Sequence, residues 1–373
     1  MGAGIAQVAA SNGHPVKIYD NNAESLTKAE KNFHSSLNKL VDKEKISKEK
    51  ADDIFSKIEF CNALEQLKPC HLVIEAILEN VEIKKKVFKA IEEITDSHCI
   101  LASNTSSLSI TSIASACHHP EKVAGLHFFN PATLMPLVEV IPGIATEMKI
   151  IQELKNLMTS WSKIPVVCKD TPGFIVNRVA RPFYGEAMRI YEEGIADFPQ
   201  IDQALKEVGK FKMGPFELTD MIGHDVNYVV TETVWKQMYF DPRYKPSLCQ
   251  KQLLDAGFLG KKTGRGFYNY QQVSTETPLV DSALAEAIFM RVIAMLINEA
   301  AEAVYLRITS KEEIELAMTK GVNYPKGLLH WADEIGVKEI YERLRKLQND
   351  YGDDRYRPSV LLKRMADSGA TFF

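Results

Sequence analysis

The chain has 373 residues, of which 45% are hydrophobic and 25% are charged, and its formal net charge is −4. This length predicts two or three domains, and the charge excludes the broad basic surface that nucleic-acid binding needs. Six cysteines without metal-ligand spacing, and the lack of any apolar run long enough for a membrane span, predict a cytoplasmic protein without a metal site.

The first ten residues are small and apolar, which is typical of the helix that follows a Gly-rich phosphate loop. Gly2 and Gly4 would let backbone N–H groups and the N-terminus of the helix approach a pyrophosphate. A predicted strand then ends at Asp20, where a dinucleotide-binding fold places the acid that accepts the ribose hydroxyls, and this acid favours NAD over NADP. The first two glycines of the G-x-G-x-x-G pattern and the strand before them would precede Met1, so we expect a nucleotide domain without its first strand. The alternatives are a truncated chain and a start that was assigned late.

Helical and strand patterns alternate as far as about residue 170, which predicts an α/β domain. Residues 24–57 carry apolar side chains at helical spacing among many Lys, Glu and Ser, and predict a long exposed helix or a helical hairpin. Further patterns predict strands at 72–77 and 99–103 and a helix at 81–94.

Polar residues follow two of these predicted strands. Because strand ends of an open parallel sheet carry ligand contacts, we expect Glu75, Glu79 and the turn at 104–107 to line the cofactor crevice. The alternative for this turn is that Ser106 or Ser107 caps the helix predicted to follow it, without any role in chemistry.

A histidine and a glutamate stand in two apolar runs, Gly125–Pro131 and Leu137–Ile141, that predict buried strands. Two such strands with a tight connection would place the Glu139 carboxylate against one ring nitrogen of His127 and leave the other nitrogen toward a cleft. Such a carboxylate fixes the tautomer and stabilises the imidazolium of a general base. The alternative is a core histidine that is satisfied by a buried acid.

Seven blocks of residues, in the same order, resemble the L-3-hydroxyacyl-CoA dehydrogenase family over residues 1 to about 270. They are Met1–Ala6, Glu75–Asn80, Ala102–Leu108, His127–Pro131, Leu137–Val140, Asp170–Arg178 and Gly260–Tyr268. The resemblance implies a Rossmann-type NAD-binding domain over 1–170 and a helical domain over 171–270. It also implies NAD-dependent oxidation of a 3-hydroxyacyl-CoA to the 3-ketoacyl-CoA, or the reverse, as in fatty-acid β-oxidation.

The resemblance also implies roles for particular residues. His127 resembles the catalytic base and Glu139 its orienting partner, and Ser106 and Asn177 resemble the side chains that hydrogen-bond the substrate oxygen. The implied NAD contacts are Gly2, Ala3, Asp20, Glu79, Lys84, Ser106, Asn130 and Lys262, and the implied CoA contacts are Ser36, Lys43 and Ser106. An idle surface lysine is the alternative for Lys43.

The last hundred residues repeat the helical segment at an offset of 113 positions. The aligned pairs are Arg178 and Arg291, Glu186 and Glu299, Ile201 and Ile314, Ala204 and Ala317, Gly214 and Gly327, Asp220 and Asp333, and Gly223 and Gly336. Asn177 aligns with Met290, so the second copy lacks the amide. We therefore expect a second, degenerate all-α domain over 285–373 after a linker at 271–284.

The second copy is expected to be architectural and to replace a subunit interface, so the chain is predicted to be a monomer or a homodimer. Two functions remain open. The first is an active dehydrogenase whose partner is an acyl-CoA, and the second is a catalytically impaired structural or binding relative with an incomplete Gly-rich loop. The presence of all four residues of the implied catalytic set favours the enzyme.

Overall fold

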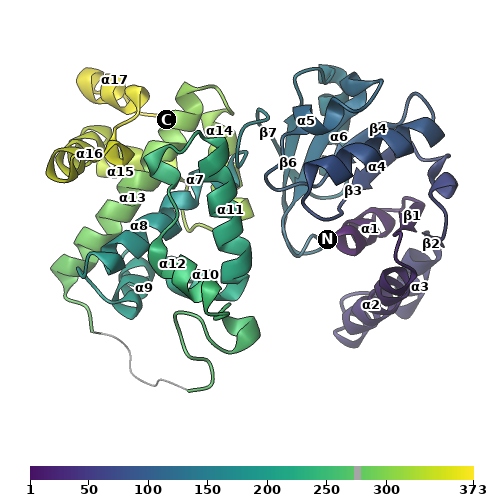
Figure 1. Cartoon of the computed structure of the whole chain (residues 1–373), viewed down its shortest axis with the longest axis horizontal. Coiled ribbons are helices and arrows are strands. Elements are labelled where there is room, and N and C mark those ends of the chain that lie inside the picture. The colour runs from purple at the N-terminus through teal and green to yellow at the C-terminus, as the bar shows by residue number, and fades with distance from the viewer. Residues whose placement is uncertain (273–278) are drawn as a thin grey trace. The chain divides into compact units, whose positions relative to one another are not determined.

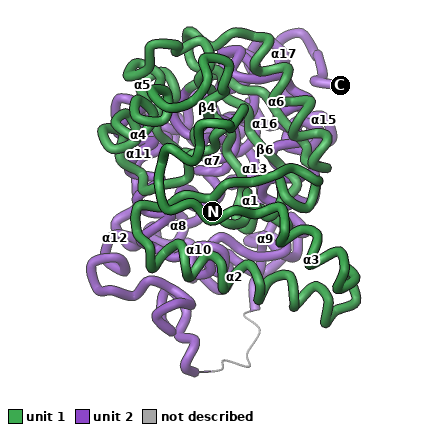
Figure 2. The backbone as a smooth tube through the Cα atoms, turned by 90° about the vertical axis from the view of Figure 1, so that its right-hand side faces the viewer, with its two compact units in different colours: residues 1–170 green, residues 171–373 purple. Residues whose placement is uncertain are grey.

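The computed structural model describes residues 1–272 and 279–373, and these form two compact units. The first unit spans Met1–Asp170 and the second spans Thr171–Phe373 (Figure 2). Residues 273–278, which belong to the predicted linker, lie outside the described residues. Within the described ranges, no helix is both long enough and apolar enough to cross a membrane.

The strands of the first unit form two groups (Figure 1). They are β1 (Val16–Tyr19), β2 (Ile58–Cys61), β3 (Leu72–Glu75), β4 (Ile100–Ser103), β5 (Val123–Phe128), β6 (Leu137–Pro142) and β7 (Ile164–Val167). β1 and β2 form a parallel pair, and the other strands form a sheet in the order β3-β4-β5-β6-β7. In this sheet β6 runs antiparallel to β5, whereas the other neighbours are parallel.

The sheet is divided between β1 and β3. Among the described residues, β1 pairs with β2 alone and β3 pairs with β4 alone. The predicted α/β class is confirmed, because mostly parallel strands alternate with helices along this unit.

Six α-helices belong to the first unit, all of whose residues are described. They are α1 (Gly2–Ser11), α2 (Ala23–Asp42), α3 (Lys48–Ser56), α4 (Val81–Ile94), α5 (Ile110–Ala114) and α6 (Met148–Ser160), with short 3-10 turns at Leu64–Leu67 and Pro120–Lys122. α2 and α3 form the predicted helical hairpin. α4 begins where the sequence predicted, because the Asn80 side chain accepts hydrogen bonds from two N–H groups of its first turn.

Different helices pack against the two faces of the five-stranded sheet. One core contains Ile5 of α1, Leu126 of β5 and Leu154 of α6, so α1 and α6 pack against the same face. Side chains alternate along a strand, and Gly125 therefore faces the other side, where it lies against Ile110 of α5. His127 is two residues further on and shares that second face.

The second unit is helical in its described residues. Its α-helices are α7 (Val176–Val179), α8 (Arg181–Glu192), α9 (Phe198–Glu207), α10 (Pro215–Ile222), α11 (His224–Gln237), α12 (Leu248–Asp255), α13 (Ser282–Tyr305), α14 (Lys311–Leu316), α15 (Leu328–Ile335), α16 (Val337–Tyr351) and α17 (Val360–Ser368). Short turns occupy Pro242–Tyr244, Lys261–Thr263, Ala317–Gly321 and Asp354–Tyr356. α13 is buried on nearly all sides, against α8, α9, α15 and α17, and forms the core of this unit.

The predicted end of the linker at residue 284 was wrong. α13 begins at Ser282, because the Asp281 side chain accepts hydrogen bonds from the N–H groups of Ala283 and Leu284 and so caps the helix.

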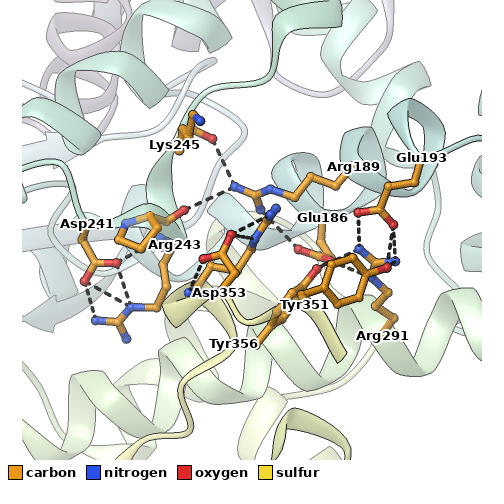
Figure 3. Close-up of polar contacts among 12 residues, drawn as sticks. Glu186, Arg189, Glu193, Asp241, Arg243, Lys245, Arg291, Tyr351, Asp353 and Tyr356 are labelled. Atoms are coloured by element: carbon orange, nitrogen blue, oxygen red, sulfur yellow. Dashed lines mark hydrogen bonds and ion pairs between the residues drawn. The ribbon is translucent and has the colours of Figure 1, made fainter. Parts of the chain in front are cut away.

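A reciprocal set of ion pairs joins the two repeated segments inside the second unit, and Figure 3 shows the part of it around Glu186. Arg291 contacts the buried carboxylate of Glu186 at 2.6 Å, and Tyr356 donates a hydrogen bond to the same carboxylate at 2.7 Å. In the opposite direction, Arg178 lies 3.7 Å from buried Glu299, which also accepts the hydroxyl of Tyr244. Each repeat therefore supplies the arginine and the tyrosine that hold the glutamate of the other, as in a contact between two identical subunits.

Candidate active site

His127 and Glu139 face each other across two neighbouring strands. They are directly opposite in the antiparallel register of β5 and β6. The Nδ1 atom of His127 lies 2.6 Å from Oε2 of Glu139, and both side chains are buried. The predicted contact between the carboxylate and one ring nitrogen is confirmed. A hydrogen bond of this kind fixes the orientation of the imidazole ring and, with Nδ1 as the donor, its tautomer.

Neighbouring groups hold the end of β5 in place. The Asn104 side chain accepts a hydrogen bond from the Phe128 N–H at 2.8 Å, and the Phe129 ring lies 4.6 Å from the imidazole ring. A Cβ atom on Gly125 would come within 2.8 Å of the Ile110 side chain, so only glycine allows α5 to pack this closely against the strand.

Glu79 accepts several hydrogen bonds from the polar turn that follows β4. Its Oε1 atom accepts hydrogen bonds from the Thr105 hydroxyl, from the Ser106 N–H at 3.0 Å and from the Ser107 hydroxyl at 3.2 Å. Burial alone would raise the pKa of Glu79, but the Thr105 hydrogen bond and the charge of Lys84 outweigh it, so this pKa is lowered. Glu79 is therefore a carboxylate at neutral pH, and it brings the predicted residue Ser106 to the carboxyl edge of the sheet.

The alternative role of Ser106 or Ser107 as a helix cap was wrong. α5 begins at Ile110, and its cap is Ser109, whose hydroxyl accepts a hydrogen bond from the Ser112 N–H at 3.1 Å. Asp170, which sequence reasoning missed, accepts the Ile110 N–H at 3.0 Å in the same turn. Its partners lie about sixty residues earlier in the chain, so no local pattern pointed to it.

Lys84 is buried between two carboxylates. Its ammonium group lies 2.6 Å from Glu75 and 3.4 Å from Glu79, and the Ser103 hydroxyl donates to Glu75 at 2.7 Å. Only 1% of the Lys84 side chain is exposed. The structure therefore places this predicted nucleotide contact behind Glu79, where it holds that carboxylate.

The start of α1 lies at the carboxyl edge of the sheet. A Cβ on Gly2 would meet Ala76 at 3.8 Å, and a Cβ on Gly4 would meet Ala132 at 3.4 Å, so the helix begins between the segments that follow β3 and β5. The first N–H groups of a helix have no partner within the helix, and they carry a partial positive charge. This end of α1 is therefore suited to a pyrophosphate.

The remaining predicted residues of the first unit lie on its surface or beside α1. Asp20 directly follows β1, is exposed, and accepts a hydrogen bond from the Asn22 N–H at 2.9 Å. Asn130 is exposed after β5. Ser36 donates to Gln7 of α1 at 3.1 Å, and Lys43 is exposed at the end of α2, about two turns further on and on the same side of the helix.

Asn177 and Lys262 belong to the second unit. Asn177 lies in α7, and its side-chain oxygen accepts a hydrogen bond from Arg181 at 3.4 Å. Lys262 is half exposed in the turn Lys261–Thr263 and forms an ion pair with Asp225.

Comparison with known proteins agrees with this geometry. The family model described as the 3-hydroxyacyl-CoA dehydrogenase NAD binding domain matches residues 1–171, and the model of that family's C-terminal domain matches residues 173–270 and 288–371. The chain belongs to the 3-hydroxyacyl-CoA dehydrogenase family. It is an NAD-dependent 3-hydroxyacyl-CoA dehydrogenase, with a Rossmann-like NAD-binding domain followed by a helical region.

Relatives of this dehydrogenase come from bacteria and from mitochondria. It is 38% identical to the 3-hydroxyadipyl-CoA dehydrogenase of Escherichia coli, over 98% of this chain and 95% of that protein. It is 42% identical to the human mitochondrial hydroxyacyl-coenzyme A dehydrogenase, over 73% of this chain and 88% of that protein. The crystal structure of a 3-hydroxybutyryl-CoA dehydrogenase from Escherichia coli K12 superposes with a TM-score of 0.93 at 38% identity, and covers 99% of this chain and 97% of that one.

The residues at the carboxyl edge fit the NAD that the family uses. Asp20 is an exposed carboxylate that can accept ribose hydroxyls, and the N-terminus of α1 offers N–H groups to phosphate oxygens. The oxygens of Glu79, which is ionised, and the polar turn beside it supply further hydrogen-bonding groups.

Proposed function

We propose that His127 is the general base of this dehydrogenase and that Glu139 orients it. The observation that carries the proposal is the 2.6 Å contact between Nδ1 of His127 and the Glu139 carboxylate. With Nδ1 held as the donor, Nε2 is the atom that takes the proton of the substrate 3-hydroxyl, and Glu139 stabilises the imidazolium that results. Bound NAD⁺ supplies the acceptor for the hydride that leaves C3 in the same oxidation.

Ser106 and Asn177 are proposed to hold the reacting oxygen. A hydroxyl and an amide are neutral donors, so they stabilise negative charge that develops on this oxygen without competing with the base for the proton. In ketone reduction the same groups polarise the C3 carbonyl, and His127 as an imidazolium returns the proton.

We propose the same nucleotide contacts that the resemblance to the family implies, except that Lys84 acts indirectly. Gly2, Ala3 and Asp20 would bind the pyrophosphate and the adenosine ribose, and Glu79, Ser106, Asn130 and Lys262 would bind the rest of the dinucleotide. Lys84 is proposed to act through Glu79, because its ammonium group already contacts two carboxylates. Ser36 and Lys43 are proposed contacts of coenzyme A, where the exposed Lys43 ammonium would face a phosphate.

The helical region is proposed to consist of two domains, 171–270 and 285–373, the second of which takes the place of a second subunit. The reciprocal contacts of Glu186 and Glu299 support this arrangement. We further propose a cytoplasmic location, supported by six cysteines that are all free thiols in the structure.

Substitution of the base tests the proposed mechanism. His127→Gln should lower kcat for NADH-dependent reduction of acetoacetyl-CoA by at least about 10²-fold, because no group remains to transfer the proton. NADH affinity, measured by fluorescence titration, should change less than about twofold. His119, an exposed histidine 3.1 Å from Glu121, provides the matched control, and His119→Gln should be fully active.

Retained turnover in His127→Gln would reject its role as the base. Wild-type protein that fails to bind NADH would instead contradict the proposed nucleotide contacts.

A further inference from the structure

Arg181 is a buried cation without a carboxylate partner. It begins α8 and is 6% exposed. One terminal nitrogen donates to the Thr231 hydroxyl at 3.0 Å, and the other donates to Asn177 at 3.4 Å. Across residues 1–272 and 279–373, Arg181 forms no ion pair, and its buried Nε has no acceptor. Burial lowers the pKa of the Arg181 guanidinium.

The other buried arginines of the second unit differ in this respect. Arg178, Arg189 and Arg243 are equally buried, and each lies within ion-pair distance of Glu186 or Glu299. An unpaired buried charge typically costs several kcal/mol. These three arginines are each paired with a carboxylate of the protein. The lack of such a carboxylate near Arg181 suits the binding of an anionic ligand.

Two tyrosines surround this cation with further polar groups. The guanidinium carbon lies 5.0 Å from the centre of the Tyr184 ring. Tyr324, which comes from the second repeated segment, is fully buried, and its hydroxyl has no hydrogen-bond partner among the described residues. Arg181 and the Tyr324 hydroxyl interact electrostatically. The cluster therefore contains more hydrogen-bond donors than acceptors, which is the composition of an anion site.

We propose that Arg181, assisted by Tyr324, binds the terminal carboxylate of a dicarboxylic acyl chain, so that the substrates are 3-hydroxyacyl-CoA thioesters whose acyl group ends in a carboxylate. The inference rests on the proposed function, in which Asn177 holds the C3 oxygen. Arg181 contacts Asn177 directly, and in a short dicarboxylic chain the carboxylate lies only a few bonds beyond C3. A guanidinium binds a carboxylate with two parallel hydrogen bonds, whereas it gives a terminal methyl group nothing.

A pair of substrates that differ only at the chain end tests this proposal. 3-Oxoadipyl-CoA and 3-oxohexanoyl-CoA have the same number of acyl carbons, but only the first ends in a carboxylate. The wild-type enzyme should prefer 3-oxoadipyl-CoA by about 10²-fold or more in kcat/KM, because the neutral chain leaves a buried cation unpaired. The ratio of the two values is an internal control for the amount of folded enzyme.

Arg181→Met should lower this ratio by at least about tenfold, mainly through KM for 3-oxoadipyl-CoA. Tyr324→Phe removes one hydroxyl and should lower the ratio by about threefold to tenfold. If Arg181→Met does not fold, this second variant tests the proposed carboxylate site on its own. Arg189→Met is the matched control, since Arg189 lies on the same helix but is paired with Glu186 at 3.2 Å, and the preference should persist.

A wild-type enzyme without preference would overturn the proposal, as would a ratio that stays unchanged in both Arg181→Met and Tyr324→Phe. Equal losses on both substrates would show that Arg181 only positions Asn177. These results leave the proposed dehydrogenase mechanism standing. A wild-type enzyme that reduces neither substrate would remove that mechanism, and this inference with it.

Discussion

At the scale of single residues, the site depends on carboxylates whose charges are held by specific partners. Glu139 holds His127, and Glu79 holds the turn that contains Ser106. Lys84 in turn neutralises both Glu75 and Glu79 from the protein interior. Loss of the lysine would leave two carboxylates close together without a cation, which disfavours the ionised form of both.

Asp20 should determine the choice of nucleotide. Asp20→Ala removes the carboxylate that is proposed to accept the ribose hydroxyls. NADH affinity should therefore fall by about tenfold, and the preference over NADPH should shrink, because repulsion of the 2′-phosphate is lost. Fluorescence titration with both nucleotides measures the two effects. Asp52→Ala, an exposed acid of α3 that is paired with Lys48, is the control. An unchanged NADH to NADPH ratio would refute the placement of Asp20.

The sequence predicted the residues of the central pair well because both lie in strongly apolar strands. It could not show that Lys84 is buried, because a lysine in an amphipathic helix is usually solvated. Arg181 was missed for a related reason. Its significance comes from the lack of a carboxylate around it, and neighbours in space are not visible in a single sequence.

At the scale of elements, both repeats of the helical region use a buried carboxylate to accept the N–H groups at the start of a helix. Asp202 of α9 accepts the N–H groups of Phe216 and Glu217 at 2.9 Å, and so satisfies the start of α10. Glu315, the residue aligned with Asp202, accepts the Leu329 N–H at the start of α15. Each carboxylate lies directly against the glycine that precedes its helix, Gly214 or Gly327. A Cβ atom on either glycine would come within 2.2 Å of the carboxylate. This contact explains why Gly214 and Gly327 occur at equivalent positions in the repeat.

Asp202 should make the stability of this region depend on pH. Burial raises its pKa to about 7, against the opposing effect of the Tyr268 hydrogen bond. Between its ordinary value of 3.8 and about 7, the folded protein holds this proton more tightly than the unfolded chain. The contribution of Asp202 to the free energy of unfolding is therefore complete at low pH and declines as pH rises through this window.

Asp202→Asn removes this titration. The difference in Tm between wild type and variant should therefore become smaller as pH is raised from about 4 to about 7. Thermal unfolding followed by circular dichroism measures both proteins in the same buffers, so the other titrating groups cancel. A difference that does not change with pH would contradict the raised pKa.

Element boundaries were predictable where local chemistry sets them. The helix over 81–94 was placed correctly because Asn80 is a strong cap and the apolar spacing is regular. α7 and α8 are separated at Ala180, and Pro182 in the first turn of α8 marks this break in the sequence, because proline is favoured at the start of a helix. The helical hairpin was one of two arrangements that the apolar spacing over residues 24–57 predicted, and the division of the sheet was not predicted.

At the scale of the whole molecule, the proposal is that the second repeat takes the place of a second subunit. The arginine of each repeat is paired with the glutamate of the other, and α13 is buried inside the same unit. Under this proposal, the surface through which two helical regions would associate is already used within the chain.

The protein should therefore sediment as a single chain of 41.9 kDa at micromolar concentration. Sedimentation velocity over a hundredfold range of concentration tests this expectation. A stable species of twice this mass would show that the second repeat does not replace a subunit interface.

The central claim is a hydride transfer to or from C3 of an acyl-CoA, coupled to proton transfer by His127. The most direct measurement uses NADH that carries deuterium at both C4 positions, with acetoacetyl-CoA as the substrate and mass spectrometry of the product. The account predicts 3-hydroxybutyryl-CoA with a single deuterium at C3, formed by the wild type and not by His127→Gln. NADH oxidation that leaves no deuterium at C3, or equal labelling by both proteins, would contradict it.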